Sequence, residues 1–244
     1  MSPFELNGKT ILVTGASSGL GKQTAITASR YGAKVIITGR NAVRLDETFR
    51  SLLGEGHMQI LADLTIQADI DRLVAGIPQI HGLVHSTGIS DMTPASYITS
   101  DTIAKTFRIS FDAIVLLTSG VLRKKKLVKN NSAIVFISSI STRYPFTGGA
   151  MYVSAKAAIE GYSRVLAKEL APRGTRVNCI APALVRTPMM NETAENYSQE
   201  VITQIEERQL LGLGNPDDVA NSIVFFLSDA SKWITAGHLI LGGG

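Results

Sequence analysis

The chain has 244 residues, 45% of them hydrophobic and 18% charged, which is the balance of a folded globular protein and excludes an intrinsically disordered one. A net charge of +4 with only 6% aromatic residues gives no basic stripe with interleaved aromatics, so we expect no nucleic-acid partner. No apolar run approaches the ~20 residues that cross a bilayer, and the start, MSPFELNGK, has no secretory apolar stretch, so we expect a cytoplasmic protein without a membrane partner.

Short runs rich in β-branched and apolar residues predict strands along the whole chain. Their hydrophobicity is continuous rather than alternating, which is typical of strands covered on both faces in a parallel sheet. The runs occupy residues 10–14, 34–38, 58–62, 82–86, 133–138, 176–181 and 238–241.

Helical patterns separate these strands. One apolar stripe consists of Ile70, Leu73, Val74 and Ile77, and another of Ala155, Ile159, Tyr162, Leu166 and Leu170. Near the end, Asn215 followed by Pro216 predicts the start of a third helix. The alternation predicts an α/β fold, a Rossmann-like doubly wound parallel sheet of about seven strands with helices on both faces, in which residues 1–244 form a single domain.

A glycine-rich turn, TGASSGLG, follows the first predicted strand and opens a helix. Its glycines, Gly15, Gly19 and Gly21, follow a G-x-x-x-G-x-G spacing, which differs from the common G-x-G-x-x-G fingerprint. Glycine in this place lets the backbone approach a pyrophosphate at the N-terminus of the helix. A tight turn alone would also favour glycine, but the position after the first strand favours dinucleotide binding.

Tyr152 and Lys156 stand four positions apart in the segment YVSAK. In a helix this spacing places both side chains on one face, about 5–6 Å apart at their Cβ atoms. Taken alone, the pair is more typical of a half-buried tyrosine beside a solvated lysine.

Several motifs in order give the pair a chemical context. TGASSGLG (14–21), Ser139, YVSAK (152–156) and RVNCIAPALVRTPM (176–189) together resemble the short-chain dehydrogenase/reductase family, in particular its 3-oxoacyl-carrier-protein reductases, over about residues 9–243. The resemblance implies a nicotinamide-dependent oxidoreductase that acts on a small carbonyl or alcohol substrate, assembles as a homotetramer or homodimer and has no metal site. The cofactor-binding residues that it implies are Gly15, Ser17, Ser18, Gly19, Leu20, Gly21, Asp63, Leu64, Ser86, Thr87, Gly88, Tyr152, Lys156, Val185 and Thr187.

The end of the second strand predicts which nicotinamide cofactor is preferred. Enzymes specific for NAD often carry an acid there for the ribose 2′-hydroxyl. This chain has Gly39 in that place and Arg40 next, and a guanidinium suits a 2′-phosphate. NADP(H) is therefore expected, with NAD(H) as the alternative, while Asp63 has a second interpretation as the cap of the following helix.

Reduction of a ketone requires a proton for the carbonyl oxygen. A free tyrosine, with a pKa near 10, disfavours its ionised form at pH 7 by ~4 kcal/mol, and an ammonium ~4 Å away supplies roughly the same energy at an effective dielectric constant of about 20. The resemblance implies that Tyr152 is the proton donor, that Lys156 lowers its pKa and bonds the nicotinamide ribose, and that Ser139 bonds the substrate carbonyl.

Three positions depart from the family pattern. His85 begins HSTG where relatives have Asn-Asn-Ala-Gly, and it is either an acid–base group or, as is more usual for such a histidine, structural. Ser110 aligns with the asparagine that relatives use to hold a water for proton relay, and a serine reaches less far. Ala183 stands in place of a glycine. The single cysteine, Cys179, is expected to be a buried inert thiol.

Three functions remain open from the sequence. The first is an NADPH-dependent reductase of a 3-oxoacyl thioester, and the second a reductase of a keto sugar or another polar precursor. The third, from a different class, is a catalytically weak NADP-binding sensor, which Ser110 alone favours. The polar segment 191–210, within a predicted substrate lid at about 189–212, does not decide between the two substrates.

Overall fold

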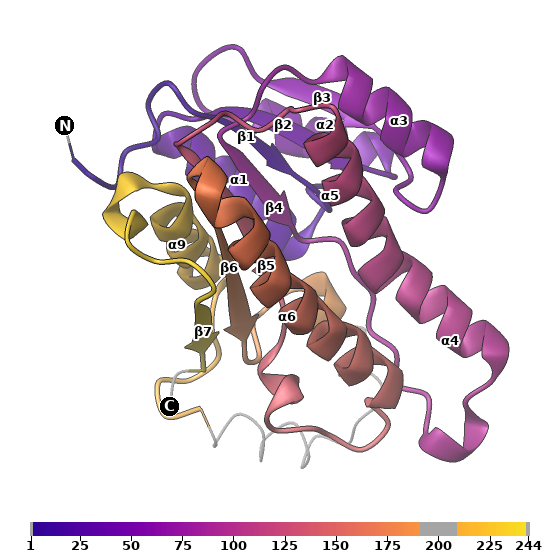
Figure 1. The fold of residues 1–244 in the computed structure, drawn as a ribbon. Coiled ribbons are helices and arrows are strands. Elements are labelled where there is room, and N and C mark those ends of the chain that lie inside the picture. The colour runs from indigo at the N-terminus through magenta and orange to yellow at the C-terminus, as the bar shows by residue number, and fades with distance from the viewer. Residues whose placement is uncertain (1, 191–208, 243–244) are drawn as a thin grey trace.

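A computed structural model describes residues 2–190 and 209–242. Its centre is a seven-stranded sheet in the order β3-β2-β1-β4-β5-β6-β7 (Figure 1), with every neighbouring pair parallel. The chain crosses from one half of the sheet to the other between β3 and β4, which places a switch point beside β1. The strands are β1 Thr10–Val13, β2 Lys34–Gly39, β3 Met58–Leu61, β4 Gly82–His85, β5 Ser132–Ile137, β6 Thr175–Pro182 and β7 His238–Leu241.

Helices cover both faces of this sheet. One face carries α1 Gly19–Arg30, α2 Ala42–Arg50 and α9 Pro216–Leu227, and the other carries α3 Gln67–Gly76, α5 Ala113–Arg123 and α6 Ala150–Leu170. Helix α4, Ser100–Phe107, continues into α5 through a π-helical turn, Arg108–Asp112. The predicted doubly wound fold is therefore confirmed.

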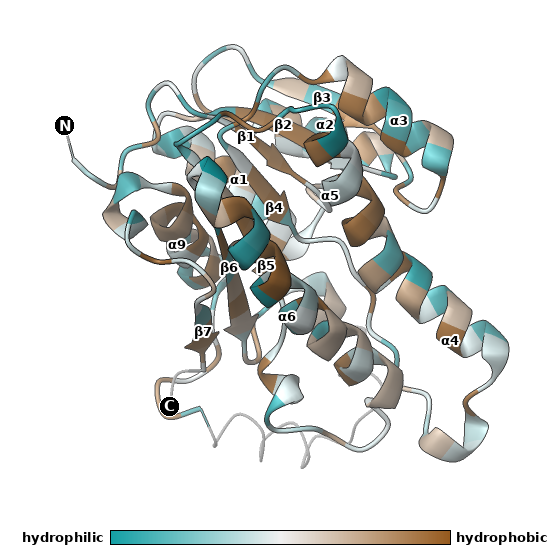
Figure 2. Cartoon of the chain, in the orientation of Figure 1, coloured by the Kyte–Doolittle hydropathy of each residue, from teal (hydrophilic) through white to brown (hydrophobic). Residues whose placement is uncertain are grey.

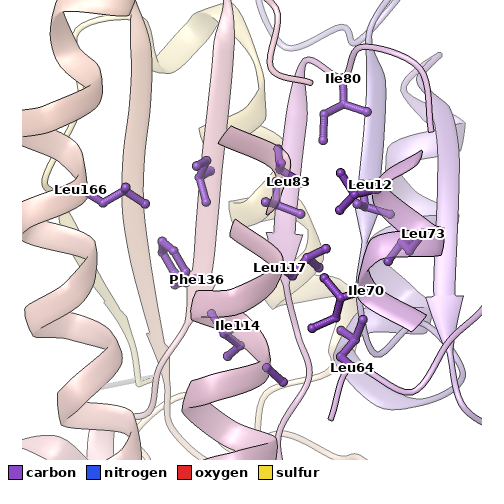
Figure 3. Packing of buried hydrophobic residues seen from close by; sticks show 14 of the residues in the cluster. Leu12, Leu64, Ile70, Leu73, Ile80, Leu83, Ile114, Leu117, Phe136 and Leu166 are labelled. Atoms are coloured by element: carbon purple, nitrogen blue, oxygen red, sulfur yellow. The ribbon is translucent and has the colours of Figure 1, made fainter. Parts of the chain in front are cut away.

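The two faces of the sheet bury two separate apolar layers. Figure 3 shows the layer beneath α3, α5 and α6, in which Leu12, Leu83 and Phe136 from the strands meet Leu73 and Leu117 from the helices. In Figure 2 the central strands are mainly hydrophobic, whereas hydrophilic residues interrupt the helices that cover them. The two edge strands depart from the expected two-sided burial, because Met58 and Leu61 of β3 are exposed and every residue of β7 is only partly buried.

Four predicted strands, those of β1, β3, β4 and β5, end one residue earlier than expected, at the edge where ligands collect in such folds. Thr14, Ser86 and Ser138 lie just beyond β1, β4 and β5, and the side chains of Thr14 and Ser138 take part in hydrogen bonds outside the ladder. Ser86 N donates to Thr14 Oγ1 at 3.1 Å, for example. The polar residues at the strand ends therefore turn the backbone out of the sheet.

The helix predictions hold with small shifts at the ends. Ile77 is buried but lies just after α3, and Tyr162 is only partly buried on α6. Helix α9 begins at Pro216, and the Asp218 carboxylate accepts a hydrogen bond from Asn215 N at 2.7 Å, as expected at a capped start. Within the described ranges no helix combines the length and apolar content needed to cross a bilayer.

His85 is a core residue at the end of β4 that packs against α5 and is 1% exposed. Its ring stacks on Phe136 at 5.0 Å, and Nε2 lies 2.9 Å from Thr118 Oγ1. The Thr118 hydroxyl donates its hydrogen bond to Ile114 O at 2.8 Å, so it accepts one from His85 Nε2. His85 Nδ1 is then unprotonated, and it has no hydrogen-bond partner among the described residues. Burial lowers the pKa of His85 to about 3, so the structural interpretation of this residue holds.

A buried neutral histidine makes the fold sensitive to acid. The unfolded chain binds a proton at His85 near pH 6.5 but the folded chain only near 3, so stability is highest above 6.5 and falls as the pH drops through this window. We expect His85→Phe, which keeps the stacking on Phe136 but cannot titrate, to remove about 2 kcal/mol of the loss between pH 7 and pH 5. Urea unfolding of both proteins at the two pH values measures this difference, and equal losses would contradict it.

Candidate active site

A cleft of about 1040 Å³ opens at the carboxyl ends of the strands, from the glycine turn after β1 to the start of α6. All of the residues predicted to bind cofactor or substrate line it, except Gly21 and Ser110, which lie behind its wall. Two segments far apart in sequence therefore meet in one cavity, as the parallel topology requires.

The glycine turn has the shape of a backbone cradle. Gly15 has a φ of +62°, and a Cβ there would lie 2.7 Å from Ser86 O. A Cβ on Gly21 would collide with Gly15 O, so this glycine lets α1 pack against the turn rather than line the cleft. The first turn of α1 contains no acidic residue, its N-cap Ser18 makes no side-chain cap hydrogen bond, and Gly19 and Leu20 line the cleft, which suits an anion such as a pyrophosphate.

Cations gather at the end of the cleft beside β2. Arg40 follows the strand, and Arg44, which the sequence analysis missed, lies one turn into α2; both line the cleft and both are exposed. A Cβ on Gly39 would lie 3.1 Å from Ser17 Oγ, which leaves little room for an acidic side chain at that position. The wall here fits an anionic group better than a neutral ribose hydroxyl.

Asp63 and Leu64 line the cleft after β3, and Asp63 also serves the chain locally. Its Oδ1 accepts hydrogen bonds from Thr65 N at 2.9 Å and from Thr65 Oγ1 at 2.7 Å, which stabilises the turn before α3. The alternative capping interpretation therefore holds in part, although α3 itself begins later, at Gln67.

The loop after β6 closes over the glycine turn. A Cβ on Gly19 would lie 3.7 Å from Thr187 Cβ, and Val185 pairs with Gly214 in a short parallel bridge. Ala183, in the place of a family glycine, lines the cleft and donates its N–H to Leu241 O at 2.7 Å. Most of the predicted lid falls in residues 191–208, outside the described residues.

Ser139, Tyr152 and Lys156 meet at the other end of the cleft. Helix α6 presents Tyr152 and Lys156 on one face, with Lys156 Nζ 5.8 Å from the centre of the Tyr152 ring. Ser139 Oγ accepts a hydrogen bond from the Ser141 hydroxyl at 2.9 Å, so its own proton is available for another partner. Ser139 also hydrogen-bonds to the Tyr152 phenol. The predicted helix face is confirmed.

Burial dominates the electrostatics of this trio. It lowers the pKa of Lys156 to about 8, and its ammonium donates to Ile137 O at 2.8 Å. Burial also raises the pKa of Tyr152, while the hydrogen bond from Ser139 acts in the opposite direction. The lowering of the Tyr152 pKa by Lys156 thus stays a prediction, because in this structure the ammonium is directed at a backbone carbonyl.

Ser110 lies in the π-helical turn between α4 and α5, a feature that the sequence pattern did not reveal. It is fully buried, and its Oγ accepts the N–H of Ile89 at 3.3 Å. A Cβ on Gly88 would lie 3.5 Å from Lys156 Nζ and 3.7 Å from Ser110 Oγ. Gly88 therefore lies next to both side chains, and its lack of a side chain leaves them near each other. Ser110 is therefore close to Lys156 but screened from the cleft.

The wall around Tyr152 contains residues that the sequence analysis did not name, although Met190 and Gln209 fall within the predicted lid at about 189–212. The Phe146 ring lies 6.3 Å from the ring of Tyr152, and Ile140, Tyr144, Pro145 and Met190 line the same cavity. Gln209 lines it too, but its amide binds Leu184 N, Leu184 O and Gly212 O. Apolar residues in a loop carry no motif, so no sequence signal marked them.

Two further residue types bear on the chemistry. Cys179 is buried in β6, and burial raises its pKa to about 12, which keeps the thiol neutral as expected. Within residues 2–190 and 209–242, no three His, Cys, Asp or Glu side chains gather where they could hold a metal ion. The arrangement offers an anion cradle at one end and a hydroxyl, a phenol and a buried amine at the other.

Known proteins share this sequence and fold. Residues 15–244 match the family described as enoyl-(acyl carrier protein) reductase. The 3-oxoacyl-[acyl-carrier-protein] reductase FabG of Rickettsia felis is 30% identical, over 99% of this chain and 98% of its own.

Two solved structures extend the comparison. A short-chain dehydrogenase/reductase described as glucose/ribitol dehydrogenase from Brucella melitensis superposes with a TM-score of 0.89 at 30% identity, covering 99% of this chain and 98% of its own. A putative NAD(P)-dependent gluconate 5-dehydrogenase from Beutenbergia cavernae, solved with NADP bound at low occupancy, gives 0.88 at 28% identity, covering 100% and 98%. The chain thus belongs to the short-chain dehydrogenase/reductase family of nicotinamide-dependent oxidoreductases.

Proposed function

We propose that this oxidoreductase reduces a ketone with NADPH, and that its substrate is an apolar 3-oxoacyl thioester or a compound of similar shape. The observation that carries the proposal is the single cleft that joins Ser139, Tyr152 and Lys156 to a cationic end marked by Arg40 and Arg44. The relative named as a 3-oxoacyl-[acyl-carrier-protein] reductase supports the substrate class by analogy.

The residues of the cleft fit a dinucleotide along its length. The turn from Gly15 to Leu20 would hold the pyrophosphate at the N-terminus of α1. The other predicted contacts are Asp63 and Leu64 for the adenine, Ser86 to Gly88 for the backbone approach and Val185 with Thr187 for the carboxamide. Arg40, with Arg44 beside it, would hold the 2′-phosphate, and the NADP found in the Beutenbergia cavernae structure supports that preference.

In the proposed reduction the chain handles one proton. A bound reduced nicotinamide supplies the hydride that forms the new C–H bond at the carbonyl carbon. Ser139 donates a hydrogen bond to the carbonyl oxygen, and Tyr152 gives that oxygen its phenolic proton as negative charge develops there. Because burial raises the pKa of Tyr152, the phenol holds its proton until the substrate oxygen becomes the stronger base.

Lys156 restores the proton and stabilises the phenolate that remains. With a pKa lowered to about 8, its ammonium is charged at pH 7 yet close to releasing a proton. Ser110, the nearest hydroxyl behind Gly88, would pass protons to this amine in place of the asparagine that relatives carry. One hydroxyl orients a water less strictly than an amide does, so slower relay is the expected consequence.

The side chains around Tyr152 favour an apolar substrate over a keto sugar. Ile140, Pro145, Phe146 and Met190 present hydrocarbon to the cavity. Of the polar residues in this wall, Ser141 and Gln209 use their hydrogen bonds on Ser139 and on the backbone, while the exposed Tyr144 adds one phenol. A sugar would need several free partners to replace its hydration, so a keto-sugar reductase is the second candidate, and a sensor without turnover is the third. A cytoplasmic homotetramer or homodimer remains the expected form.

Removal of the phenolic hydroxyl tests the chemistry. We expect Tyr152→Phe to lower kcat for ketone reduction roughly 10²–10⁴-fold, because a general acid contributes about that much. The Kd for NADPH, followed by nucleotide fluorescence, should change less than about twofold. Tyr97→Phe, the same change at an exposed tyrosine outside the cleft, is the matched control. Full turnover by Tyr152→Phe would eliminate the phenol as proton donor.

Reversal of charge at the cationic end tests the cofactor assignment. Arg40→Asp loses charge-assisted hydrogen bonds worth about 1.5–3 kcal/mol and adds repulsion, so the ratio of kcat/KM for NADPH over NADH should fall roughly 100-fold or more. Arg50→Asp, at the exposed far end of α2, should leave the ratio unchanged. An unaltered ratio in Arg40→Asp would argue against a 2′-phosphate site.

A substrate panel separates the three functions. With NADPH consumption as the readout, we expect 3-oxoacyl thioesters to be reduced with a kcat/KM roughly 10-fold or more above that for keto sugars, since each buried CH₂ contributes about 0.8 kcal/mol. The reverse order would support the keto-sugar reductase. No consumption by any ketone, with NADPH still bound, would support the sensor.

A further inference from the structure

Glu160 lies on α6 one helical turn beyond Lys156, outside the lining of the cleft. Its side chain is only 12% exposed, so its carboxylate requires partners inside the protein. Oε1 accepts hydrogen bonds from Ser138 Oγ at 2.6 Å and from Thr142 Oγ1 at 2.8 Å. None of the steps proposed above uses this group.

The two hydroxyls that bind Glu160 flank Ser139 on either side. Ser138 precedes it at the end of β5, and Thr142 closes the short 3-10 turn Ile140–Thr142 that follows. Thr142 Oγ1 also lies 3.0 Å from Ser139 O, so its contact with the carboxylate holds the hydroxyl against the turn that contains Ser139. The Glu160 carboxylate therefore binds this loop on both sides of Ser139, at Ser138 and at Thr142.

The strength of these contacts follows from the charge of the acceptor. A hydroxyl bonded to a carboxylate makes a shorter and roughly twofold stronger hydrogen bond than one bonded to a neutral group, with typical lengths of about 2.5–2.7 Å, and the Ser138 contact has that length. Each hydroxyl has a longer alternative contact with a neutral backbone carbonyl. Ser138 Oγ lies 3.4 Å from Lys156 O, and Thr142 Oγ1 lies 3.0 Å from Ser139 O.

A third group approaches the same oxygen from the last strand. His238 Nε2, at the start of β7, lies 3.2 Å from Glu160 Oε1 without aligning for a hydrogen bond, and it has no hydrogen-bond partner within residues 2–190 and 209–242. This contact places the carboxylate between α6, the Ser139 loop and β7. Three elements that are distant in sequence thus meet at one side chain.

We propose that Glu160 is a positioning residue that fixes Ser139 relative to Tyr152. The phenol and the carboxylate belong to one rigid helix, so clamping the loop to that helix sets the distance between the two groups that receive the carbonyl oxygen. A displacement of about 1 Å at such a site costs up to roughly 100-fold in rate. The inference rests on the proposed function, in which Ser139 and Tyr152 both bind that oxygen.

Kinetics of Glu160→Ala test the clamp. We expect kcat for ketone reduction to fall roughly 10- to 100-fold, while the Kd for NADPH changes less than about twofold. Glu160→Gln keeps an oxygen that accepts hydrogen bonds, so it should recover most of the loss. Glu169→Ala, which removes an exposed carboxylate from the same helix, is the matched control and should behave as the parent protein.

A double-mutant cycle shows whether Glu160 acts through the two hydroxyls. In a Ser138→Ala/Thr142→Val background, Glu160→Ala should lower kcat less than about twofold further. An equal loss in both backgrounds would overturn the proposal, and so would a Glu160→Ala protein as active as Glu169→Ala. Melting temperatures of all variants identify any that fails to fold, and the conservative Glu160→Gln protein then decides.

Crystal structures separate this inference from the proposed function. Ser139 Oγ should lie further from the Tyr152 hydroxyl in Glu160→Ala than in the parent protein, whatever the substrate is, and an unmoved Ser139 would overturn the clamp. If the parent reduces ketones and Tyr152→Phe does not, yet Glu160→Ala retains full kcat, only the clamp fails. If Tyr152→Phe remains fully active, the proposed function fails, and the displacement of Ser139 still tests the clamp.

Discussion

The hydrogen bond from Lys156 Nζ to Ile137 O determines the form of this cleft. It joins Lys156, in the N-terminal half of α6, to Ile137, the last residue of β5. It also provides a hydrogen-bond acceptor for a lysine that is only 7% exposed. A buried charge tolerates little displacement, because its stabilisation depends on the geometry of its few partners. Tyr152 on the same face of α6 and Ser139 just beyond β5 are therefore brought together by the group that also provides the positive charge.

The same burial that fixes the geometry sets the acid–base character of the site. It raises the pKa of the phenol and lowers that of the amine, so both neutral forms are favoured relative to water. A neutral phenol is the form that gives up a proton, which suits reduction, whereas oxidation of an alcohol requires the phenolate. In the proposed function the structure without substrate is thus prepared for the reductive direction.

Sequence patterns were sufficient for the fold and for most of the cleft because both depend on short-range signals. Continuous apolar runs marked the strands, the glycine turn marked the start of α1, and the spacing of Tyr152 and Lys156 fixed one helical face. Arg44 and Phe146 escaped notice because an exposed arginine and a loop aromatic have no spacing that marks them. Glu160 escaped for a different reason, since its partners Ser138 and Thr142 approach from another element and only the fold brings them to it.

Two of the three departures from the family pattern, His85 and Ser110, lie beside α5. His85 supports α5 through Thr118, and Ser110 occupies the π-helical turn from which α5 begins. The imidazole ring is stacked on Phe136, while Ser110 Oγ accepts the N–H of Ile89. The third departure, Ala183, lines the cleft itself. The cleft therefore still brings Ser139, Tyr152 and Lys156 together, while the departure at Ser110 lies behind Gly88, where a proton relay to Lys156 would run.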